Sequence, residues 1–467
     1  MNNSKNIVLI EPPTGEKKIT SFRYPPMGLL ALATFLIKEG YNVSLIDACI
    51  DNLSIEEIIK RVRATNTRIV GISSMSVNII HAFRIAEALK ENDQKIRVIT
   101  GGIHPTVMPQ HTLSNKNIDI VVMGEGEITT SVLLRALQNN EDISAIEGVA
   151  FRKGDEIVLN RRRPLINGLD SLPIPIYPLL DIKKYKSPYA KKAPFVSIVR
   201  SRGCPFDCTF CGNPQMFGRT FRCQSPERTI KEIDYLVKEL NIREISFKDT
   251  ELTLDRNLEK LCDLLIEKHY DLIWSCNGRV SNINENLLKK MKQAGCYSIT
   301  FGIESGNEGI IKHIKKQITL DQARFAVKAA KKAGLQIVAN FMIGNPFDTK
   351  ETIEQTISFA KELDTDYAYF GFATPFPGTE LRKQAELNNW ILDASMDAIR
   401  YDDCMMNATS LATEELRLYL DKAYKSFYFR PKYLFHRLLH SDFKDFVNYF
   451  YGFKAIMANT LKVKKSK

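Results

Sequence analysis

The sequence predicts an α/β protein with two successive units of alternating strands and helices, followed by a helical C-terminal extension. Three observations lead to this fold class. Apolar runs alternate with segments of helical periodicity over residues 1–145, a proline-rich stretch follows, and a second alternation of the same kind begins at residue 195. A chain of 467 residues is also too long for a single small core. We therefore expect two α/β domains rather than one.

The first unit, residues 1–145, contains five apolar runs suited to parallel strands buried on both faces. They are residues 7–13, 43–48, 69–76, 98–102 and 118–127. Segments such as GLLALATFLIKEG, which follows the first run, have helical periodicity. This pattern predicts a five-stranded, doubly wound sheet of the flavodoxin-like (Rossmann-like) type.

Small and polar residues follow several of these runs. In doubly wound sheets, ligands bind beyond the carboxyl ends of the strands, where such residues lie. Glycines allow a large ligand to approach the backbone closely, and hydroxyl groups can bind its polar groups. The candidate ligand-binding residues are Ser73, Ser74, Gly101, Gly102, Thr106, Gly124 and Gly126.

Residues 146–194 carry prolines at 164, 173, 175, 178, 188 and 194. Prolines at this density disfavour regular secondary structure, so we expect an interdomain linker here. The second unit, residues 195–407, has six further strand candidates: 195–199, 243–249, 272–278, 298–304, 336–344 and 366–373. Six β/α repeats without a clear seventh predict a partial (βα)6 TIM-like barrel.

Three cysteines, Cys204, Cys208 and Cys211, lie in the loop after the first strand of this barrel, with the spacing C-x3-C-x2-C. A structural zinc site needs four ligands and a redox dithiol needs two. A cubane [4Fe-4S] cluster bound by three thiolates leaves one iron open to a ligand that is not a protein residue. The spacing therefore favours an iron-sulfur cluster with a vacant position.

These three cysteines, with Phe210 before the last, resemble the signature of the radical S-adenosylmethionine (radical SAM) superfamily, and the first unit looks like the cobalamin-binding domain of one large subgroup. The resemblance implies that the cysteines hold a [4Fe-4S] cluster whose open iron is chelated by S-adenosylmethionine. Reductive cleavage would then give a 5′-deoxyadenosyl radical, which abstracts hydrogen from an unactivated carbon. It also implies cobalamin as a third cofactor.

Two more motifs extend the resemblance. FKDTELT is similar to the motif that contacts the methionine amine, where many relatives have Gly-Gly-Glu, and its Asp249 and Glu251 suit an ammonium partner. FGIESG is similar to the motif that approaches the ribose and carboxylate, which implies roles for Gly302, Glu304 and Ser305.

Five further features of the sequence bear on the site. Residues 341–346 resemble the strand that lines the adenine, and Arg279 is equally compatible with pairing to a carboxylate and with a surface position. In the first unit Pro26 and Gly28 fit the family's first loop. The Asp-x-His-x-x-Gly motif of many cobalamin domains is replaced after Asp47, so we expect no histidine ligand to cobalt from this loop. His104 is expected to be a structural imidazole bonded to backbone.

The net charge of +11 is concentrated at the C-terminus, where residues 421–467 carry eleven Lys/Arg against three Asp. Residues 424–453 also contain twelve Phe/Tyr. This extension, residues 408–467, is expected to be helical. It could cap the barrel, line a pocket for a large apolar, lipid-like substrate, or contact a membrane surface peripherally. No nucleic-acid-binding module is recognisable, so no nucleic acid partner is expected.

Six of the nine cysteines are scattered without the pattern of a secreted disulfide framework, which favours a cytoplasmic location. The missing signal-peptide layout and the missing membrane-spanning run favour the same location.

The resemblance implies a methyltransferase that acts on an unactivated carbon through the 5′-deoxyadenosyl radical and methylcobalamin. It implies a small-molecule substrate and an electron donor such as flavodoxin or ferredoxin. The alternatives are a radical oxidative cyclase of the tetrapyrrole type and a non-enzymatic cobalamin/iron-sulfur sensor. A methylthiotransferase fits less well, because its N-terminal domain carries three cysteines of its own.

Overall fold

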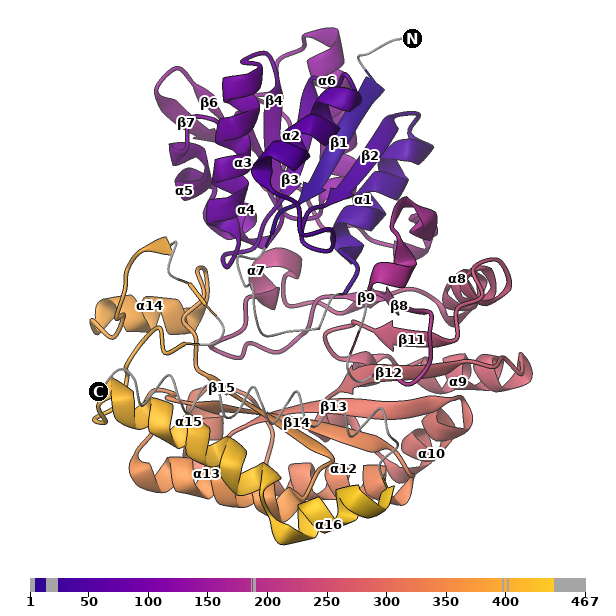
Figure 1. The fold of residues 1–467 in the computed structure, drawn as a ribbon, viewed down its shortest axis with the longest axis vertical. Helices are drawn as coiled ribbons and strands as arrows, with labels where there is room; N and C mark the ends of the chain where they lie inside the picture. The colour runs from indigo at the N-terminus through magenta and orange to yellow at the C-terminus, as the bar shows by residue number, and fades with distance from the viewer. Residues whose placement is uncertain are drawn as a thin grey trace. The chain divides into compact units, whose positions relative to one another are not determined.

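The computed structural model describes residues 5–13, 24–185, 187, 190–396, 399–400 and 403–440. They fall into two compact units (Figure 1). The first unit is drawn from Met1–Pro205, Gly212–Glu244 and Phe376–Gly378. The second is drawn from Phe206–Cys211, Ile245–Pro375 and Thr379–Lys467. Packing thus assigns the first barrel strand to the first unit, while the domain boundaries expected at residues 145 and 195 stay a prediction.

The first unit contains a seven-stranded sheet with the order β2-β1-β3-β4-β5-β6-β7. Its strands are β1 (Asn6–Glu11), β2 (Asn42–Asp47), β3 (Ile69–Ser73), β4 (Arg97–Gly101), β5 (Ile120–Val122), β6 (Val149–Lys153) and β7 (Glu156–Leu159). Strands β1 to β5 pair in parallel, and β6 and β7 are antiparallel additions. The predicted flavodoxin-like sheet is confirmed, with two strands more than expected.

Helices cover both faces of this sheet. Helices α1 (Met27–Lys38) and α6 (Gly126–Asn139) contribute to one apolar core, and α2 (Ile55–Ala64) and α3 (Ile79–Asn92) contribute to the other. The two short helices α4 (Ile103–Val107) and α5 (Pro109–Ser114) follow β4. Because each central strand is covered on both sides, its apolar run is nearly continuous, as the sequence indicated.

The first third of the expected linker contains regular secondary structure. Strands β6 and β7 form a hairpin inside residues 146–194, and Gly154 adopts φ +63° at its turn. The proline argument fails here because the prolines begin only at residue 164. Beyond the hairpin the chain has only the short 3-10 turns η2 (Leu169–Ser171), η3 (Tyr177–Leu179) and η4 (Ile182–Lys184) as named elements among its described residues, as prolines at that density predict.

The second sheet has six strands in the order β15-β14-β13-β12-β11-β8. They are β8 (Phe195–Ile198), β11 (Glu244–Phe247), β12 (Ile273–Gly278), β13 (Cys296–Glu304), β14 (Gln336–Ile343) and β15 (Tyr367–Phe372). The accompanying helices are α8 (Pro226–Lys238), α9 (Leu258–Glu267), α10 (Glu285–Gln293), α11 (Glu308–His313), α12 (Leu320–Lys332), α13 (Lys350–Leu363) and α14 (Glu380–Leu387). The predicted six-stranded partial barrel is confirmed.

Helices in this part of the chain begin with the side-chain caps and the proline that the sequence predicts. Ser225 caps α8 by accepting a hydrogen bond from the Arg228 N–H, and Pro226 occupies the first helical position, where its missing N–H costs nothing. Thr319 and Gln322 form a capping box at the start of α12.

The C-terminal helix α15 (Thr413–Tyr428) packs along the edge of β15, and α16 (Pro431–His440) follows α15 (Figure 1). The Tyr424 hydroxyl donates to the Phe370 carbonyl at 2.8 Å and accepts from the Phe370 N–H at 3.2 Å. The Tyr428 hydroxyl does the same with Ala368 at 2.9 and 3.1 Å. Tyrosine hydroxyls thus satisfy the outward-facing backbone groups that an open barrel leaves at its edge.

The capping interpretation therefore fits the described part of the extension, and residues 441–467 lie outside the described residues. In the part of the chain that the structure covers, no helix combines the length and the apolar character needed to cross a bilayer.

Candidate cofactor site

The three-cysteine loop lies between two short strands, β9 (Ser201–Arg202) and β10 (Arg222–Cys223), which pair antiparallel and close its base. Gly203 has φ +86°, and a Cβ there would lie 1.9 Å from the Thr220 carbonyl oxygen, so only glycine fits. Cys204 follows directly and is 7% exposed. None of the three cysteines is in a disulfide bond, so their thiols can act as cluster ligands.

Backbone bonds in the second unit fix the rest of the loop. The Thr209 N–H donates to the Ile314 carbonyl at 3.0 Å, and the Leu381 N–H donates to the Thr209 carbonyl at 2.8 Å. Phe210 packs against an apolar cluster that includes Leu381 and Met406. Cys208 and Cys211 therefore flank a short stretch whose backbone and aromatic side chain are both held in place.

Two cations lie close to Cys208. Burial raises the pKa of the Cys208 thiol, whereas the charges of Lys316 and Arg279 lower it. Cluster ligation requires the thiolate form, and nearby positive charge favours that form. Lys316 and Arg279 thus offset part of the cost of placing a thiolate in this buried setting.

Arg279 is not the surface arginine that the sequence allowed for, because only 2% of it is exposed. Its guanidinium stacks on Phe206 at 3.4 Å from the ring centroid. It also donates to the backbone carbonyls of Lys316 and Gln317 and, at 3.1 Å, to the Ser281 hydroxyl. Arg279 thus ties the cysteine loop, through Phe206, to the turn that carries Lys316.

Glu304 and Lys316 form a buried ion pair, with Lys316 Nζ 2.9 Å from Glu304 Oε1. Although burial opposes its charged form, the carboxylates of Glu304 and Glu251 raise the pKa of Lys316. A Cβ at Gly302 would lie 2.4 Å from Glu304 Oε1 and 2.8 Å from Lys316 Nζ. Gly302 therefore makes room for this ion pair, where the sequence suggested room for a cofactor.

Asp249 and Glu251 follow β11, and both are buried or nearly so. Burial is the main cause of the raised pKa of Glu251, and Lys316 and Arg279 act against it. Among the described residues, Glu251 Oε2 is buried without a hydrogen-bond partner. A buried carboxylate oxygen with no partner is costly, so it is suited to receive a ligand donor such as an ammonium group.

Two other predicted positions are already engaged within the fold. Ser305 is buried, and its hydroxyl lies 3.1 Å from that of Thr356 and accepts from the Asn307 N–H at 3.1 Å. In residues 341–346, Phe341 is buried and stacks on Phe370, whereas Met342 is half-buried. Strand alternation therefore leaves Met342 more accessible to a ligand than Phe341.

The predicted corrinoid-binding residues lie at the carboxyl ends of β3, β4 and β5, where the sequence placed them. Gly124 adopts φ +79°, and a Cβ there would meet nothing within 4 Å, so this backbone faces open space. Gly102 differs, because a Cβ would lie 2.5 Å from the Ser74 carbonyl oxygen. Gly101 and Gly126 have only ordinary contacts around a Cβ. Of the four glycines, Gly124 best fits the close approach of a large cofactor.

The candidate hydroxyl groups at this edge differ in whether they already have hydrogen-bond partners within the fold. Thr106 donates to the Gly102 carbonyl at 2.7 Å and accepts from the Gly124 N–H at 2.9 Å, so it holds the loops together. The Ser73 hydroxyl bonds to Glu11. Ser74 Oγ is buried without a hydrogen-bond partner in the described part of the chain.

His104 is fully buried, and its Nδ1 and Nε2 lie 3.0 Å from the Ser76 hydroxyl and from His111 Nδ1. Burial and the neighbouring His111 lower the pKa of His104 to about 3. The structural role is confirmed, but the partners are side chains and not the expected backbone.

The loop after β2 keeps the aspartate of the Asp-x-His-x-x-Gly pattern, Asp47, which organises the loop without the histidine and glycine. Its carboxylate accepts from the Ile50 N–H at 2.9 Å and from the Tyr185 hydroxyl at 2.8 Å. Asp47 is the register partner of Glu11 on β1. Burial and the charge of Asp47 raise the pKa of Glu11 to about 8.

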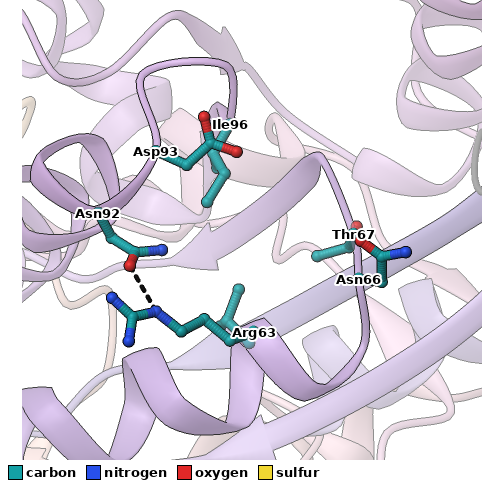
Figure 2. A pocket seen from close by; sticks show the side chains of 7 residues that line it. Arg63, Asn66, Thr67, Asn92, Asp93 and Ile96 are labelled. Carbon is teal, nitrogen blue, oxygen red and sulfur yellow. Dashed lines mark hydrogen bonds between the residues drawn. The ribbon is translucent and has the colours of Figure 1, made fainter.

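A separate small pocket of about 140 Å³ is lined by Val62, Arg63, Asn66, Thr67, Asn92, Asp93 and Ile96 (Figure 2). Its residues lie at the ends of α2 and α3 and before β3 and β4, which is the amino-terminal edge of the sheet. A hydrogen bond from Arg63 to Asn92 spans it. It therefore lies at the opposite edge of the sheet from the candidate cofactor residues.

Sequence reasoning missed Lys316, Phe206 and the environment of Arg279. Lys316 lies next to Lys315, whose side chain is largely exposed and pairs with Glu380 on the surface. Composition alone does not distinguish these two lysines. The available signal was the spacing from Glu304, but it is interpretable only once the turn after α11 is known.

Comparison with known proteins gives two domain matches. The radical SAM superfamily model matches residues 198–360, and the B12 binding domain model matches residues 20–134. An uncharacterised methyltransferase, PH0819, from Pyrococcus horikoshii is 38% identical over 432 residues, covering 92% of this chain and 93% of that protein. The anaerobic magnesium-protoporphyrin IX monomethyl ester cyclase of Rubrivivax gelatinosus is 30% identical, covering 77% of this chain and 66% of that protein.

Solved structures share the fold. The radical SAM methyltransferase TsrM from Kitasatospora setae, with cobalamin and a [4Fe-4S] cluster bound, has a TM-score of 0.68 at 17% identity, covering 82% of this chain and 78% of that chain. The cobalamin-dependent radical SAM enzyme OxsB has a TM-score of 0.75 at 17% identity, covering 97% of this chain and 71% of that chain. At these identities the likeness concerns the fold.

Proposed function

The chain belongs to the radical SAM enzymes that carry an N-terminal cobalamin-binding domain, and we propose that it transfers a methyl group to an unactivated carbon of a small-molecule substrate. The observation that carries this proposal is the combination of the two domains in a chain that is 38% identical, over 92% of its length, to a protein named as a methyltransferase. A relative from Streptomyces wedmorensis, cytidylyl-2-hydroxyethylphosphonate methyltransferase, is 26% identical and also supports methyl transfer.

The family's cofactors are a [4Fe-4S] cluster, S-adenosylmethionine and cobalamin, which together supply a 5′-deoxyadenosyl radical and a carrier for the methyl group. Cys204, Cys208 and Cys211 would bind the cluster. Lys316 and Arg279 would stabilise its negative charge at Cys208. Arg279, through Phe206, would also fix the position of the loop.

The candidate contacts to S-adenosylmethionine come from three carboxylates, one lysine, one glycine and one serine. Glu251, with its buried and unpartnered Oε2, would accept from the methionine amine, and Asp249 beside it is the second candidate. The Glu304–Lys316 pair, which Gly302 accommodates, would place one positive and one negative charge near the same ligand. Ser305 is retained as a candidate through its backbone, since its hydroxyl bonds to Thr356.

The corrinoid would lie against the carboxyl edge of the first sheet. Gly124 offers open backbone there, and Ser74 offers a buried hydroxyl that has no partner in the described chain. Ser73, Gly101, Gly102, Thr106 and Gly126 would support this surface. No histidine follows Asp47 within its loop, so this loop would supply no histidine ligand to cobalamin, unlike the loop of the Asp-x-His-x-x-Gly domains.

An oxidative cyclase is the second candidate, because cyclases such as that of Rubrivivax gelatinosus reach 30% identity. One structural observation weighs against it. The aromatic residues of the extension could have lined a pocket for a large apolar substrate, but two of them, Tyr424 and Tyr428, hydrogen bond to the edge of β15.

The two candidates differ in the products of S-adenosylmethionine. The test uses protein purified without oxygen, loaded with cluster and cobalamin, and reduced in the presence of S-adenosylmethionine. Formation of S-adenosylhomocysteine beside 5′-deoxyadenosine is the expected result, because methyl donation yields the former. Deoxyadenosine alone would favour the cyclase, and the absence of both would favour a sensor.

Radical SAM enzymes take electrons from a reductant, and flavodoxin or ferredoxin is the proposed donor here. A cytoplasmic location is proposed because none of the nine cysteines is in a disulfide bond. Peripheral membrane contact through residues 441–467 is proposed from their basic and aromatic composition. Liposome flotation of the full chain against a truncation after His440 tests this, since that truncation keeps α15 and α16. Equal partitioning would remove the membrane proposal.

A further inference from the structure

Four charged side chains of the first unit form a buried network. Arg202 Nη1 lies 2.8 Å from Glu125 Oε1, and Arg202 Nη2 lies 2.5 Å from Glu127 Oε1. Arg222 Nη1 lies 3.0 Å from Glu125 Oε1. The four side chains are at most 15% exposed, and their two positive and two negative charges balance.

One end of the network belongs to the cysteine loop. Arg202 ends β9, two residues before Cys204, and its register partner across the hairpin is Arg222 on β10. Between Arg202 and Cys204 lies Gly203, which packs against the Thr220 backbone. A displacement of Arg202 would therefore be transmitted to the first cluster ligand.

The other end belongs to the candidate corrinoid loop. Glu125 occupies the N-cap position of α6, without a side-chain cap bond, and Glu127 lies in the first turn, so both carboxylates also benefit from the positive end of the helix dipole. They alternate with Gly124 and Gly126, and Gly124 N–H is held by Thr106. Glu125 Oε2 additionally accepts from the Ile166 N–H at 2.6 Å, which fixes its carboxylate plane.

Stability alone does not explain such a network. Buried ion pairs are often no more stabilising than well-packed apolar residues, but they fix geometry because removal of one member leaves an unpaired buried charge. Here the geometry that is fixed joins the glycine backbone offered to one cofactor with the loop that binds the other.

We propose that Glu125 and Glu127 are positioning residues that couple the cobalamin-binding loop to the iron-sulfur cluster loop through Arg202 and Arg222. This inference rests on the proposed use of both cofactors. A cluster that orders its own loop should also hold the cobalamin-binding loop in place, so its presence should tighten the binding of cobalamin. Because coupling between two binding sites is reciprocal, cobalamin should stabilise the bound cluster by the same factor.

The test measures hydroxocobalamin affinity by absorption titration, using full-length protein reconstituted with or without iron and sulfide. In the wild type the dissociation constant of hydroxocobalamin should be about tenfold lower with the cluster than without it, which is within the usual range for coupled sites. In Glu127→Gln the ratio of these two dissociation constants should fall to about one, while iron and sulfide content stay normal. A Glu127→Gln variant with the wild-type ratio would overturn the proposal, as would a wild type whose ratio is already one.

The matched control is Glu232→Gln, which removes the buried ion pair between Arg228 and Glu232 in the same unit. Glu232 bonds to the Tyr177 hydroxyl and to Arg228, so this control should keep the wild-type ratio. An equal loss of coupling in Glu232→Gln would point to general destabilisation and overturn the proposal.

Two further observations keep the test decisive. If Glu127→Gln does not fold, Arg202→Lys provides the same readout, because lysine keeps the charge but loses the two-pronged contact with both carboxylates. Failure of the wild type to bind hydroxocobalamin in either state would contradict the proposed function itself, whereas binding without coupling would contradict only this inference.

Discussion

Lys316 Nζ lies 2.9 Å from Glu304 Oε1, in a buried setting that also influences Cys208 and Glu251. Glu304 adopts a positive φ of 72° and follows a register irregularity in β13. An ion pair, an unusual backbone conformation and a cluster ligand thus lie together. Such strain in a buried non-glycine residue is typical of functional sites.

Replacement of Lys316 by methionine should leave the Glu304 carboxylate buried without its partner. We expect the free energy of unfolding to fall by about 3 kcal/mol, as measured by urea denaturation. Lys315→Met is the matched control, because that neighbouring lysine makes only a surface ion pair with Glu380 and should cost less than about 1 kcal/mol. Equal costs for the two variants would contradict the assigned geometry.

Gly302→Ala should displace the same ion pair, because the added Cβ would lie within 3 Å of both charged groups. We expect S-adenosylmethionine binding, measured by equilibrium dialysis, to weaken by at least tenfold, while cobalamin binding stays unchanged. Gly28→Ala is the control, since a Cβ there meets nothing within 4 Å. Unaltered S-adenosylmethionine binding in Gly302→Ala would remove the pair from the proposed binding site.

Tyr428→Phe should open the edge of β15, because the hydroxyl both donates to and accepts from the Ala368 backbone. We expect a loss of about 1–3 kcal/mol in unfolding free energy. Hydrogen exchange at the Ala368 amide should accelerate. Tyr419→Phe on the same helix is the control, as its ring contacts Lys422. Unchanged exchange at Ala368 would contradict the capping role of α15.

Glu11 should make stability depend on pH. Its pKa in the folded protein is raised to about 8, so the protonated form is favoured by folding. This contribution is fully present below the unfolded value near 4.5 and is lost as pH rises through 8. In Glu11→Gln the free energy of unfolding should therefore fall less between pH 5 and pH 8 than in the wild type. The difference between the two falls should be no more than about 5 kcal/mol. Urea denaturation at pH 5, 6.5 and 8 measures it, with exposed Glu91→Gln as control, and an identical slope in Glu11→Gln would disprove the assignment.

Much of the fold could be predicted because apolar runs report burial directly. The five parallel strands of the first sheet and all six of the barrel were expected, although the run at 118–127 contains only the three-residue strand β5. The hairpin of β6 and β7 was missed because it lies at the edge of its sheet, where the alternation is weak and half-buried. Proline density in the following residues then biased the whole segment towards a linker.

The site was predictable where chemistry is local and unpredictable where it depends on distant contacts. The spacing of Cys204, Cys208 and Cys211 indicates an iron-sulfur cluster site without any knowledge of distant residues. The role of Gly302 does not, because the atoms that need its space belong to Glu304 and Lys316. The roles of Glu125 and Glu127, which alternate with Gly124 and Gly126, were likewise not predictable, since their partners lie about 75 residues or more along the chain.

The most direct test of the account is one assay on anaerobically reconstituted protein that contains iron, sulfide and cobalamin. After reduction with S-adenosylmethionine present, 5′-deoxyadenosine is quantified, and the corrinoid absorption spectrum of the same desalted sample is recorded. The account predicts deoxyadenosine together with a retained corrinoid, and no deoxyadenosine from Cys208→Ala. A wild type that forms no deoxyadenosine, or a Cys208→Ala variant that forms as much as the wild type, would contradict the account.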